Sequence, residues 1–234
     1  MRLSDRLEKI LTLTSKCTCL ADIGTDHGFV PIEAVRRGIA ERALACDVRK
    51  GPLERADQHV REAGLSGKID CRLGDGLMPV HEKEADAVVI TGMGGMLMCR
   101  LLSEGRHALP SDGTAFVKQL ILSPHSDIPE VRRTVSALGF KIADEDVVYE
   151  EGKYYFYLVC VPSAEGLYTA EEFEFGPVLL KKRPELWLKY LKEKAERNES
   201  VLKKLDEAPD TEENRKTKEK IREENTRIGY ILNR

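Results

Sequence analysis

The most constraining feature of the sequence is a regular alternation of short apolar runs with amphipathic segments over residues 3–138. The apolar runs have the length of buried strands, whereas the segments between them repeat apolar residues every three or four positions, as helices do. Strands that alternate with helices indicate βαβ units and a mostly parallel sheet. The predicted strands cover residues 20–23, 43–46, 69–73, 85–90 and 115–122, and the predicted helices cover 3–13, 30–37, 52–63, 96–102 and 128–138.

Two further apolar runs, at residues 140–149 and 153–161, follow each other without a helix between them. The short turn that separates them, Glu150-Glu151-Gly152, is typical of a β-hairpin, so one edge strand is expected to be antiparallel. The sequence therefore predicts an α/β protein with a sheet of about seven strands, most of them parallel.

The pattern changes after Pro162. Residues 166–234 contain two helical repeats with heptad-like spacing, separated by Ala208-Pro209-Asp210-Thr211, which can end one helix and cap the next. This predicts an α-helical coiled-coil hairpin as a second domain, after a first domain of residues 1–165. From residue 179 onward the chain holds 16 Lys and Arg against 12 Asp and Glu, although its net charge is −3. The hairpin is therefore either a surface for a polyanion or a solvated pair of helices with mixed charges.

Composition excludes several classes of protein. The chain is 41% hydrophobic and 33% charged, which is too apolar for a disordered protein. No stretch approaches the roughly 18 uncharged apolar residues that a membrane span needs. The first nine residues carry charges throughout, unlike a signal peptide, so we expect a cytoplasmic protein without membrane contacts.

The six cysteines lie far apart in the sequence, apart from the pair Cys17 and Cys19, and form no C-x-x-C motif. Zinc sites need close pairs at fixed spacing, so we expect reduced, structural thiols and no metal site. We also expect the protein to be a monomer.

The segment Asp22-Ile23-Gly24-Thr25-Asp26-His27-Gly28 follows the first predicted strand and precedes a helix. Ligands of open α/β sheets bind at the carboxyl ends of the strands, and the two glycines allow a tight turn and close approach of a ligand. Two carboxylates disfavour a pyrophosphate, which needs N–H donors and positive charge. S-adenosylmethionine, with a sulfonium cation and an ammonium group, suits this loop better. An ordinary turn between strand and helix is the alternative.

Three other strand ends carry residues suited to the same ligand. Asp47 ends the second strand, about where nucleotide-type folds place an acid that accepts hydrogen bonds from ribose hydroxyls. Asp75, next to Gly76, follows the third strand, where its carboxylate can accept from an adenine amino group. The fourth strand runs into Thr91-Gly92-Met93-Gly94-Gly95, which indicates close approach of a methyl donor or an acceptor base. Each segment is also compatible with an ordinary tight turn.

Four motifs together resemble the bacterial tRNA (adenine-22 N1)-methyltransferases, the TrmK-like family: Leu3-Ser4-x-Arg6-Leu7, Ala21 to Gly28, Gly74-Asp75-Gly76-Leu77 and Thr91 to Gly95. The similarity extends to Glu151-Gly152-Lys153-x-Tyr155 and the C-terminal hairpin. It implies a Rossmann-like class I methyltransferase fold followed by a helical coiled coil that contacts tRNA, and S-adenosyl-L-methionine as cofactor. The expected cofactor-binding residues are Asp22, Gly24, Thr25, Gly28, Asp47, Val48, Asp75, Gly76, Gly92 and Met93.

Adenine N1 has a lone pair in the ring plane, so its methylation needs alignment more than a strong base. We expect Asp26 to stabilise charge that arrives on the adenine, with cofactor binding as its rival role. His27 is a candidate base or a structural hydrogen-bond donor. The expected substrate-binding residues are Arg6, Gly94, Ser123, Pro124 and His125.

One turn departs from the family. The resemblance implies Gln-Pro-Asn after the fifth strand, where this chain has Ser123-Pro124-His125. The fourth strand also lacks the Asn/Asp-Pro-Pro-Tyr/Phe tetrad of methyltransferases that modify exocyclic amino groups, which favours a ring nitrogen as acceptor. Two alternatives remain open from the sequence: a methyltransferase that acts on a small molecule or a protein, and an inactive module that binds S-adenosylmethionine or RNA.

Overall fold

The computed structural model describes residues 3–109, 116–163 and 168–234. The chain divides into two units, Met1–Val178 and Leu179–Arg234. The predicted domain boundary, between residues 165 and 166, lies outside the described residues. The first unit extends as far as Val178 because helix α6 (Ala170–Phe175) packs against helix α5 (Ile128–Ala137).

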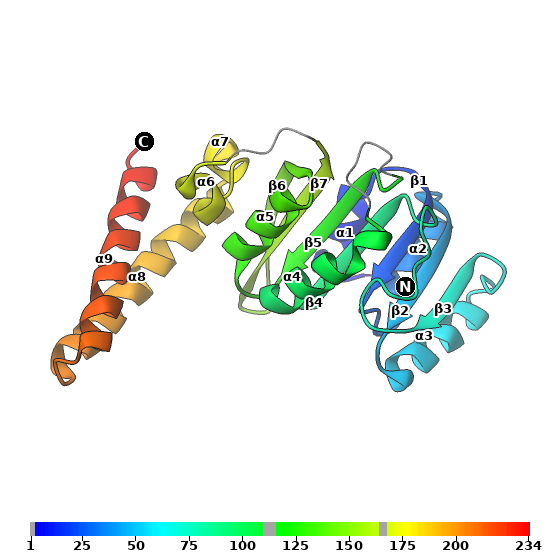
Figure 1. Cartoon of the computed structure of the whole chain (residues 1–234), viewed down its shortest axis with the longest axis horizontal. Coiled ribbons are helices and arrows are strands. Elements are labelled where there is room, and N and C mark those ends of the chain that lie inside the picture. The colour runs from blue at the N-terminus through cyan, green and yellow to red at the C-terminus, as the bar shows by residue number, and fades with distance from the viewer. Residues whose placement is uncertain (1–2, 110–115, 164–167) are drawn as a thin grey trace. The chain divides into compact units, whose positions relative to one another are not determined.

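The first unit is built on a sheet of seven strands in the order β3-β2-β1-β4-β5-β7-β6 (Figure 1). Strands β1 to β5 are parallel, and β7 is antiparallel to both β5 and β6. This confirms the predicted fold class, including the antiparallel hairpin at one edge. The strands are β1 (Cys17–Ile23), β2 (Ala40–Asp47), β3 (Ile69–Leu73), β4 (Ala87–Met93), β5 (Gln119–Pro124), β6 (Phe140–Glu150) and β7 (Lys153–Pro162).

Side chains of alternate residues in each strand enter two separate cores, because successive side chains of a strand point to opposite faces. Leu20, Val89 and Ile121 belong to one core, and their neighbours Val88 and Ile90 belong to the other. Both faces of the sheet are therefore covered, as a parallel sheet requires. The first core includes residues from α1 (Asp5–Leu13), α2 (Phe29–Arg36) and α3 (Lys50–Glu62). The second includes residues from α4 (Gly95–Glu104) and α5, together with Ala108 and Leu109, which follow the short 3-10 helix η1 (Gly105–His107).

A buried ion pair holds the end of the first unit. The Arg132 guanidinium donates from Nε to Glu145 Oε1 at 2.8 Å, and from Nη1 to the carbonyl oxygens of Phe173 and Glu174 at 2.9 Å each. The other carboxylate oxygen of Glu145 accepts from the Val178 backbone at 2.9 Å. These bonds satisfy two charges that burial would otherwise make costly, and they fix the chain between α6 and the second unit.

The second unit consists of α7 (Leu179–Lys182), α8 (Glu185–Glu207) and α9 (Glu212–Leu232). Two ion pairs show that helices α8 and α9 lie antiparallel: Lys194 pairs with Glu224 at 2.6 Å, and Lys218 pairs with Asp206 at 2.9 Å. The Thr211 hydroxyl caps α9, in agreement with the predicted helix start. A helical hairpin is therefore present, while its description as a coiled coil stays a prediction.

Candidate active site

A cavity of about 360 Å³ opens where β1, β4 and β5 end. This is the edge of a parallel sheet at which ligands of α/β proteins bind. Ten residues predicted from the sequence line it: Arg6, Asp22, Gly24, Thr25, Asp26, His27, Gly28, Gly92, Ser123 and His125. The cavity also contains Leu7, Ile10, Phe29, Val30, Arg49 and Thr91.

Asp22 is the most perturbed carboxyl group of the cavity. Asp22 is the second-to-last residue of β1 and is only 5% exposed. Burial, helped by the negative charge of Asp47, raises the pKa of Asp22 to about 6, while a hydrogen bond from Thr25 opposes the shift. A buried carboxylate without a cationic partner is stabilised by a positively charged ligand.

The loop after β1 is held against β2. The backbone N–H groups of Gly24 and Thr25 both donate to the Cys46 carbonyl oxygen, at 2.8 Å and 3.0 Å. Gly24 has φ +82°, and a Cβ atom there would lie 3.0 Å from Cε of Met93. Only glycine therefore combines this backbone conformation with the close approach of the Met93 side chain. Gly28 follows as the residue at which α2 begins.

Asp26 and His27 occupy the rim of the cavity. An oxygen of Asp26 accepts from Arg55 Nη2 at 2.6 Å, and the other lies 3.3 Å from His27 Nε2. The hydrogen bond with Arg55 lowers the pKa of Asp26, with a smaller contribution from His27, so this carboxyl group stays ionised at neutral pH. The His27 ring is nearly parallel to those of Phe29 and His59, with centroids 5.2 Å and 5.7 Å away.

Asp47 ends β2 beside the cavity without lining it. Its carboxylate accepts from the Arg49 backbone at 2.7 Å, and its carbonyl oxygen accepts from Gly74 at 3.0 Å. The Arg49 side chain reaches both the cavity and Asp47, with Nε 3.5 Å from Oδ1. Between these two residues the Val48 side chain is 59% exposed, which leaves an apolar surface available to a ligand.

Asp75 and Gly76 lie outside this cavity. The Asp75 carboxylate is exposed and pairs with Arg100 Nη1 on α4 at 2.9 Å. Gly76 has φ +55°, and a Cβ atom there would come within 2.6 Å of the Leu101 side chain. The glycine therefore allows α4 to pack closely, which is a structural reason for its presence that the sequence did not reveal.

The remaining predicted residues lie at the ends of β4 and β5. Gly92 lines the cavity, and no atom lies within 4 Å of the position that a Cβ would occupy. Met93 packs against Gly24, while Gly94 begins α4 and faces the Ser126 hydroxyl. Pro124 is buried as the last residue of β5. Met93, Gly94 and Pro124 therefore support the walls of the cavity without lining it.

Arg6 lines another side of the cavity, with aromatic side chains of β7 behind it. The Arg6 guanidinium lies over the Tyr155 ring, with 5.0 Å between its central carbon and the ring centroid. The Arg6 backbone is held at both ends, because its N–H donates to Glu150 at 3.4 Å and its carbonyl accepts from the Tyr157 hydroxyl at 3.0 Å. In the described part of the chain no carboxylate lies within ion-pair distance of this guanidinium, which leaves it free for an external anion.

Several residues of the site were missed by the sequence analysis. Arg49 and Arg55 could have been suspected, because they follow the acid at the end of β2 on the same loop and helix. Phe29 and His59 carried no signal, since their ring contacts depend on how α3 packs beside α2. Tyr157 lies two residues after Tyr155 on β7, so the two side chains share one face of the strand. Only the pairing of β7 with β5 brings Tyr157 to Ser123.

A metal site and a membrane-spanning helix would each be recognisable in the described residues. No three His, Cys, Asp or Glu side chains there are grouped as metal ligands would be. Among the helices in those ranges, none has the length and apolar character needed to cross a bilayer.

The family model for TrmK, described as tRNA (adenine(22)-N(1))-methyltransferase, matches residues 20–227. The chain belongs to the TrmK family. The tRNA (adenine(22)-N(1))-methyltransferase of Bacillus subtilis is 31% identical over 228 residues, which are 95% of this chain and 92% of that protein. This confirms the resemblance predicted from the four motifs, and it favours a tRNA methyltransferase over enzymes for small molecules or proteins.

Solved structures of other bacterial proteins agree with this chain over 99% of its length. A Listeria monocytogenes protein has a TM-score of 0.93 at 31% identity and covers 99% of this chain and 100% of its own. A Streptococcus pneumoniae protein, solved in complex with S-adenosyl-L-methionine, has a TM-score of 0.86 at 31% identity, with 99% and 100% coverage. The structural similarity therefore covers both the sheet and the C-terminal helices.

Proposed function

We propose that this chain transfers the methyl group of S-adenosyl-L-methionine to N1 of an adenosine in tRNA, at position 22 by its family. One observation carries the proposal: a cavity that contains a buried carboxylate, Asp22, lies at the strand ends where the family motifs converge. We further propose that the enzyme works as a monomer in the cytoplasm.

The residues at the cavity fit this cofactor by their charge. Asp22 and the nearby Asp47 are buried acids that favour a sulfonium and an ammonium group over a phosphate. The Asp47 carboxylate can accept from ribose hydroxyls, and the exposed Val48 can contact the adenine ring. The Streptococcus pneumoniae relative with bound S-adenosyl-L-methionine supports this choice of cofactor. For Asp75 to contact the cofactor, its carboxylate would have to leave the ion pair with Arg100.

The bound cofactor supplies a methyl group on a positively charged sulfur. The lone pair of adenine N1 forms the new bond to the methyl carbon as the carbon–sulfur bond breaks, and that electron pair stays on sulfur. Positive charge thus moves from sulfur to the adenine. The ionised Asp26 at the rim of the cavity can stabilise this charge, while His27 and its neighbouring rings hold the loop in place.

The other side of the cavity suits a nucleotide. The guanidinium of Arg6 has no ion-pair partner in the described residues and lies over Tyr155, so it can bind a phosphate of the RNA. Ser123 is buried next to the Tyr157 hydroxyl and can hydrogen-bond the substrate base. Gly94 and Pro124 shape the turns that carry these contacts.

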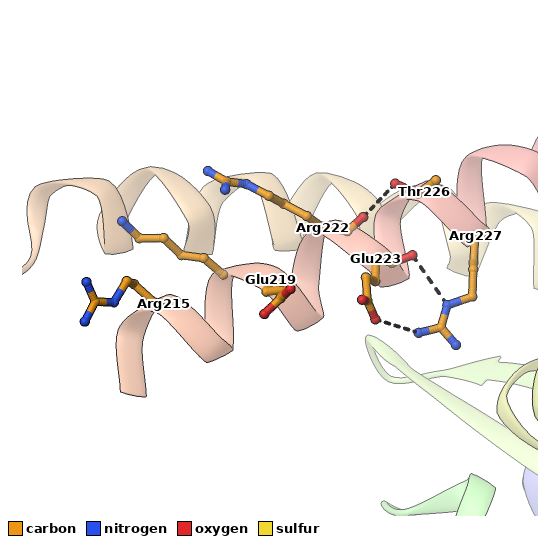
Figure 2. Close-up of a pocket in the computed structure, with 7 residues that line it drawn as sticks. Arg215, Glu219, Arg222, Glu223, Thr226 and Arg227 are labelled. Atoms are coloured by element: carbon orange, nitrogen blue, oxygen red, sulfur yellow. Dashed lines mark hydrogen bonds and ion pairs between the residues drawn. The ribbon is translucent and has the colours of Figure 1, made fainter. Parts of the chain in front are cut away.

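The second unit provides a further surface for RNA. Helix α9 presents Arg215, Lys218, Arg222 and Arg227 along one groove, together with Glu219, Glu223 and Thr226 (Figure 2). Several of these charges pair within the protein, for example Arg227 with Glu223 at 3.7 Å. We propose that the cations of this groove contact phosphates of tRNA, because such contacts position a nucleic acid without reading its sequence.

The direct test is incubation of the protein with labelled S-adenosylmethionine and unmodified tRNA, followed by digestion and identification of the methylated nucleoside. We expect 1-methyladenosine, at a single position. A tRNA whose target adenosine is replaced by guanosine is the matched control and should take up no label. Methylation of the adenine amino group, or of the control tRNA, would contradict the proposal.

A further inference from the structure

His125 is placed where this chain departs from the turn that its family resemblance implies. Its backbone N–H donates to the Met93 carbonyl oxygen at 2.9 Å, which ties the residue after β5 to the end of β4. Its ring lines the cavity and meets the Tyr155 ring edge-on, with centroids 5.9 Å apart. Within the described ranges, neither ring nitrogen hydrogen-bonds to another residue. An exposed imidazole in the cavity is thus available to a ligand.

The charges around His125 keep its ring neutral near pH 7. Partial burial, with the positive charges of Arg6 on α1 and Lys153 on β7, lowers the pKa of His125. Among the described residues, the other ionisable groups that line the cavity or contact Arg6 and His125 are Asp22, Asp26, His27, Arg49, Glu150, Tyr155 and Tyr157. Glu150 Oε1 accepts from the Arg6 backbone at 3.4 Å, and within the described ranges no ion pair joins its carboxylate to the imidazole.

We propose that a ring nitrogen of His125 accepts a hydrogen bond from the exocyclic amino group of the target adenine, and that acid abolishes this contact by protonating the ring. The inference rests on the proposed function. A neutral imidazole has one acceptor nitrogen, whereas an imidazolium has two donors and none. Only the neutral ring can therefore receive the amino group.

The chemistry makes this contact stronger as the reaction proceeds. Because N1 gives its lone pair to the methyl carbon, positive charge spreads over the adenine and reaches the amino group, which becomes a better donor. An acceptor beside it is worth more in the transition state than in the ground state, which is the condition for accelerating the reaction. A protonated His125 would instead place a second positive charge next to the developing one.

The test compares His125→Asn with His125→Ala in single-turnover reactions with saturating cofactor, between pH 5 and pH 8. Asparagine offers an acceptor oxygen that does not titrate, so the rate of His125→Asn at pH 7.5 should stay within about threefold of wild type. The decrease in rate at acidic pH that protonation of His125 causes in wild type should be absent from this variant. His125→Ala should be slower by roughly tenfold at pH 7.5, which corresponds to ~1.4 kcal/mol. His81→Asn, at an exposed histidine outside the cavity, is the control and should keep the wild-type pH profile.

A second substrate isolates the contact. A tRNA with purine riboside at the target position lacks the amino group, so wild type and His125→Ala should methylate it at equal rates. If His125→Asn kept the wild-type acid limb, or if His125→Ala slowed both substrates equally, the inference would be wrong. Failure of wild type to methylate the adenosine tRNA at pH 7.5 would instead overturn the proposed function.

Discussion

Asp22 and Asp47 lie at the ends of the neighbouring parallel strands β1 and β2, where burial raises the pKa of Asp22 and the negative charge of Asp47 adds to the shift. Both acids are buried, and Asp22 has no cationic partner in the described residues. The protein thus maintains an unfavourable charge at its site, which a positively charged ligand would relieve. Such a cost in the free protein is common where a binding site is prepared in advance.

The first prediction concerns Asp22→Asn. The folded pKa of about 6 lies above the ordinary value of 3.8, so ionisation of Asp22 destabilises the fold as pH rises through that range. At pH 7.5 the variant should be more stable than wild type by on the order of 2 kcal/mol in urea unfolding, and the difference should vanish below pH 4. Calorimetry should show that the variant no longer binds S-adenosylmethionine. Higher stability with unchanged affinity would separate Asp22 from the cofactor.

Cofactor affinity should also depend on pH through Asp22. Protonation below about pH 6 removes the negative charge that attracts the ligand, so the Kd should rise as pH falls from 7 to 5. In Asp22→Asn this dependence should disappear, together with most of the binding. A wild-type Kd that stays constant over this range would contradict the assignment.

Asp47→Ala should weaken cofactor binding by ~1–3 kcal/mol, because a hydrogen bond to a buried acceptor is lost. The variant Asp70→Ala is a matched control, since Asp70 is an exposed acid on β3 that pairs with Arg72. Calorimetry of both variants distinguishes a local contact from a general change of charge. Equal affinities in Asp47→Ala and wild type would refute the ribose contact.

Asp26→Asn should lower the rate of methyl transfer by roughly tenfold, ~1.4 kcal/mol, with little change of cofactor Kd. The exposed position and the Arg55 partner keep the expected effect modest. The exposed pair Asp57 and Arg61 on α3 provides the control variant Asp57→Asn, which should behave as wild type. Should the substitution of Asp26 alter only the affinity for the cofactor, its role would be binding and not catalysis.

Salt dependence tests the groove on α9. Replacing Arg222 by Gln should weaken tRNA binding and reduce the slope of log affinity against log salt by about 1, as expected for one lost phosphate contact. The exposed Lys68 in the first unit gives the control Lys68→Gln, for which the slope should not change. Identical slopes for both variants would place the RNA elsewhere.

The order of strands along the chain and the identity of the ligand loop could be predicted because both depend on local patterns. Alternating apolar runs define β1 to β5, and the acids and glycines from Asp22 to Gly28 define the loop by their own chemistry. The position of β7 was not predictable in this way. Its pairing with β5 depends on contacts between residues far apart in sequence, such as Leu122 with Leu158.

Side-chain partners were the least predictable part of the site. Asp75 follows a strand in the same way as Asp47, yet the structure pairs it with Arg100, and nothing in its local sequence indicates that contact. Likewise, Gly76 looks like part of a ligand turn, while its closest neighbour is Leu101 of α4. Roles of this kind depend on how helices pack against the sheet, and a single sequence does not encode that packing in any short motif.

The insertion of β7 between β5 and β6 sets the order in which the protein can mature on the ribosome. Tyr155 and Tyr157, which hold Arg6 beside the cavity, are among the last residues of the sheet to be synthesised. A nascent chain that has emerged only as far as β5 already contains the acids and glycines of the loop but lacks this wall. Translation therefore delivers the acidic, glycine-rich loop of the cavity first, and the wall beside Arg6 is completed only when the last strand pairs with β5 and β6.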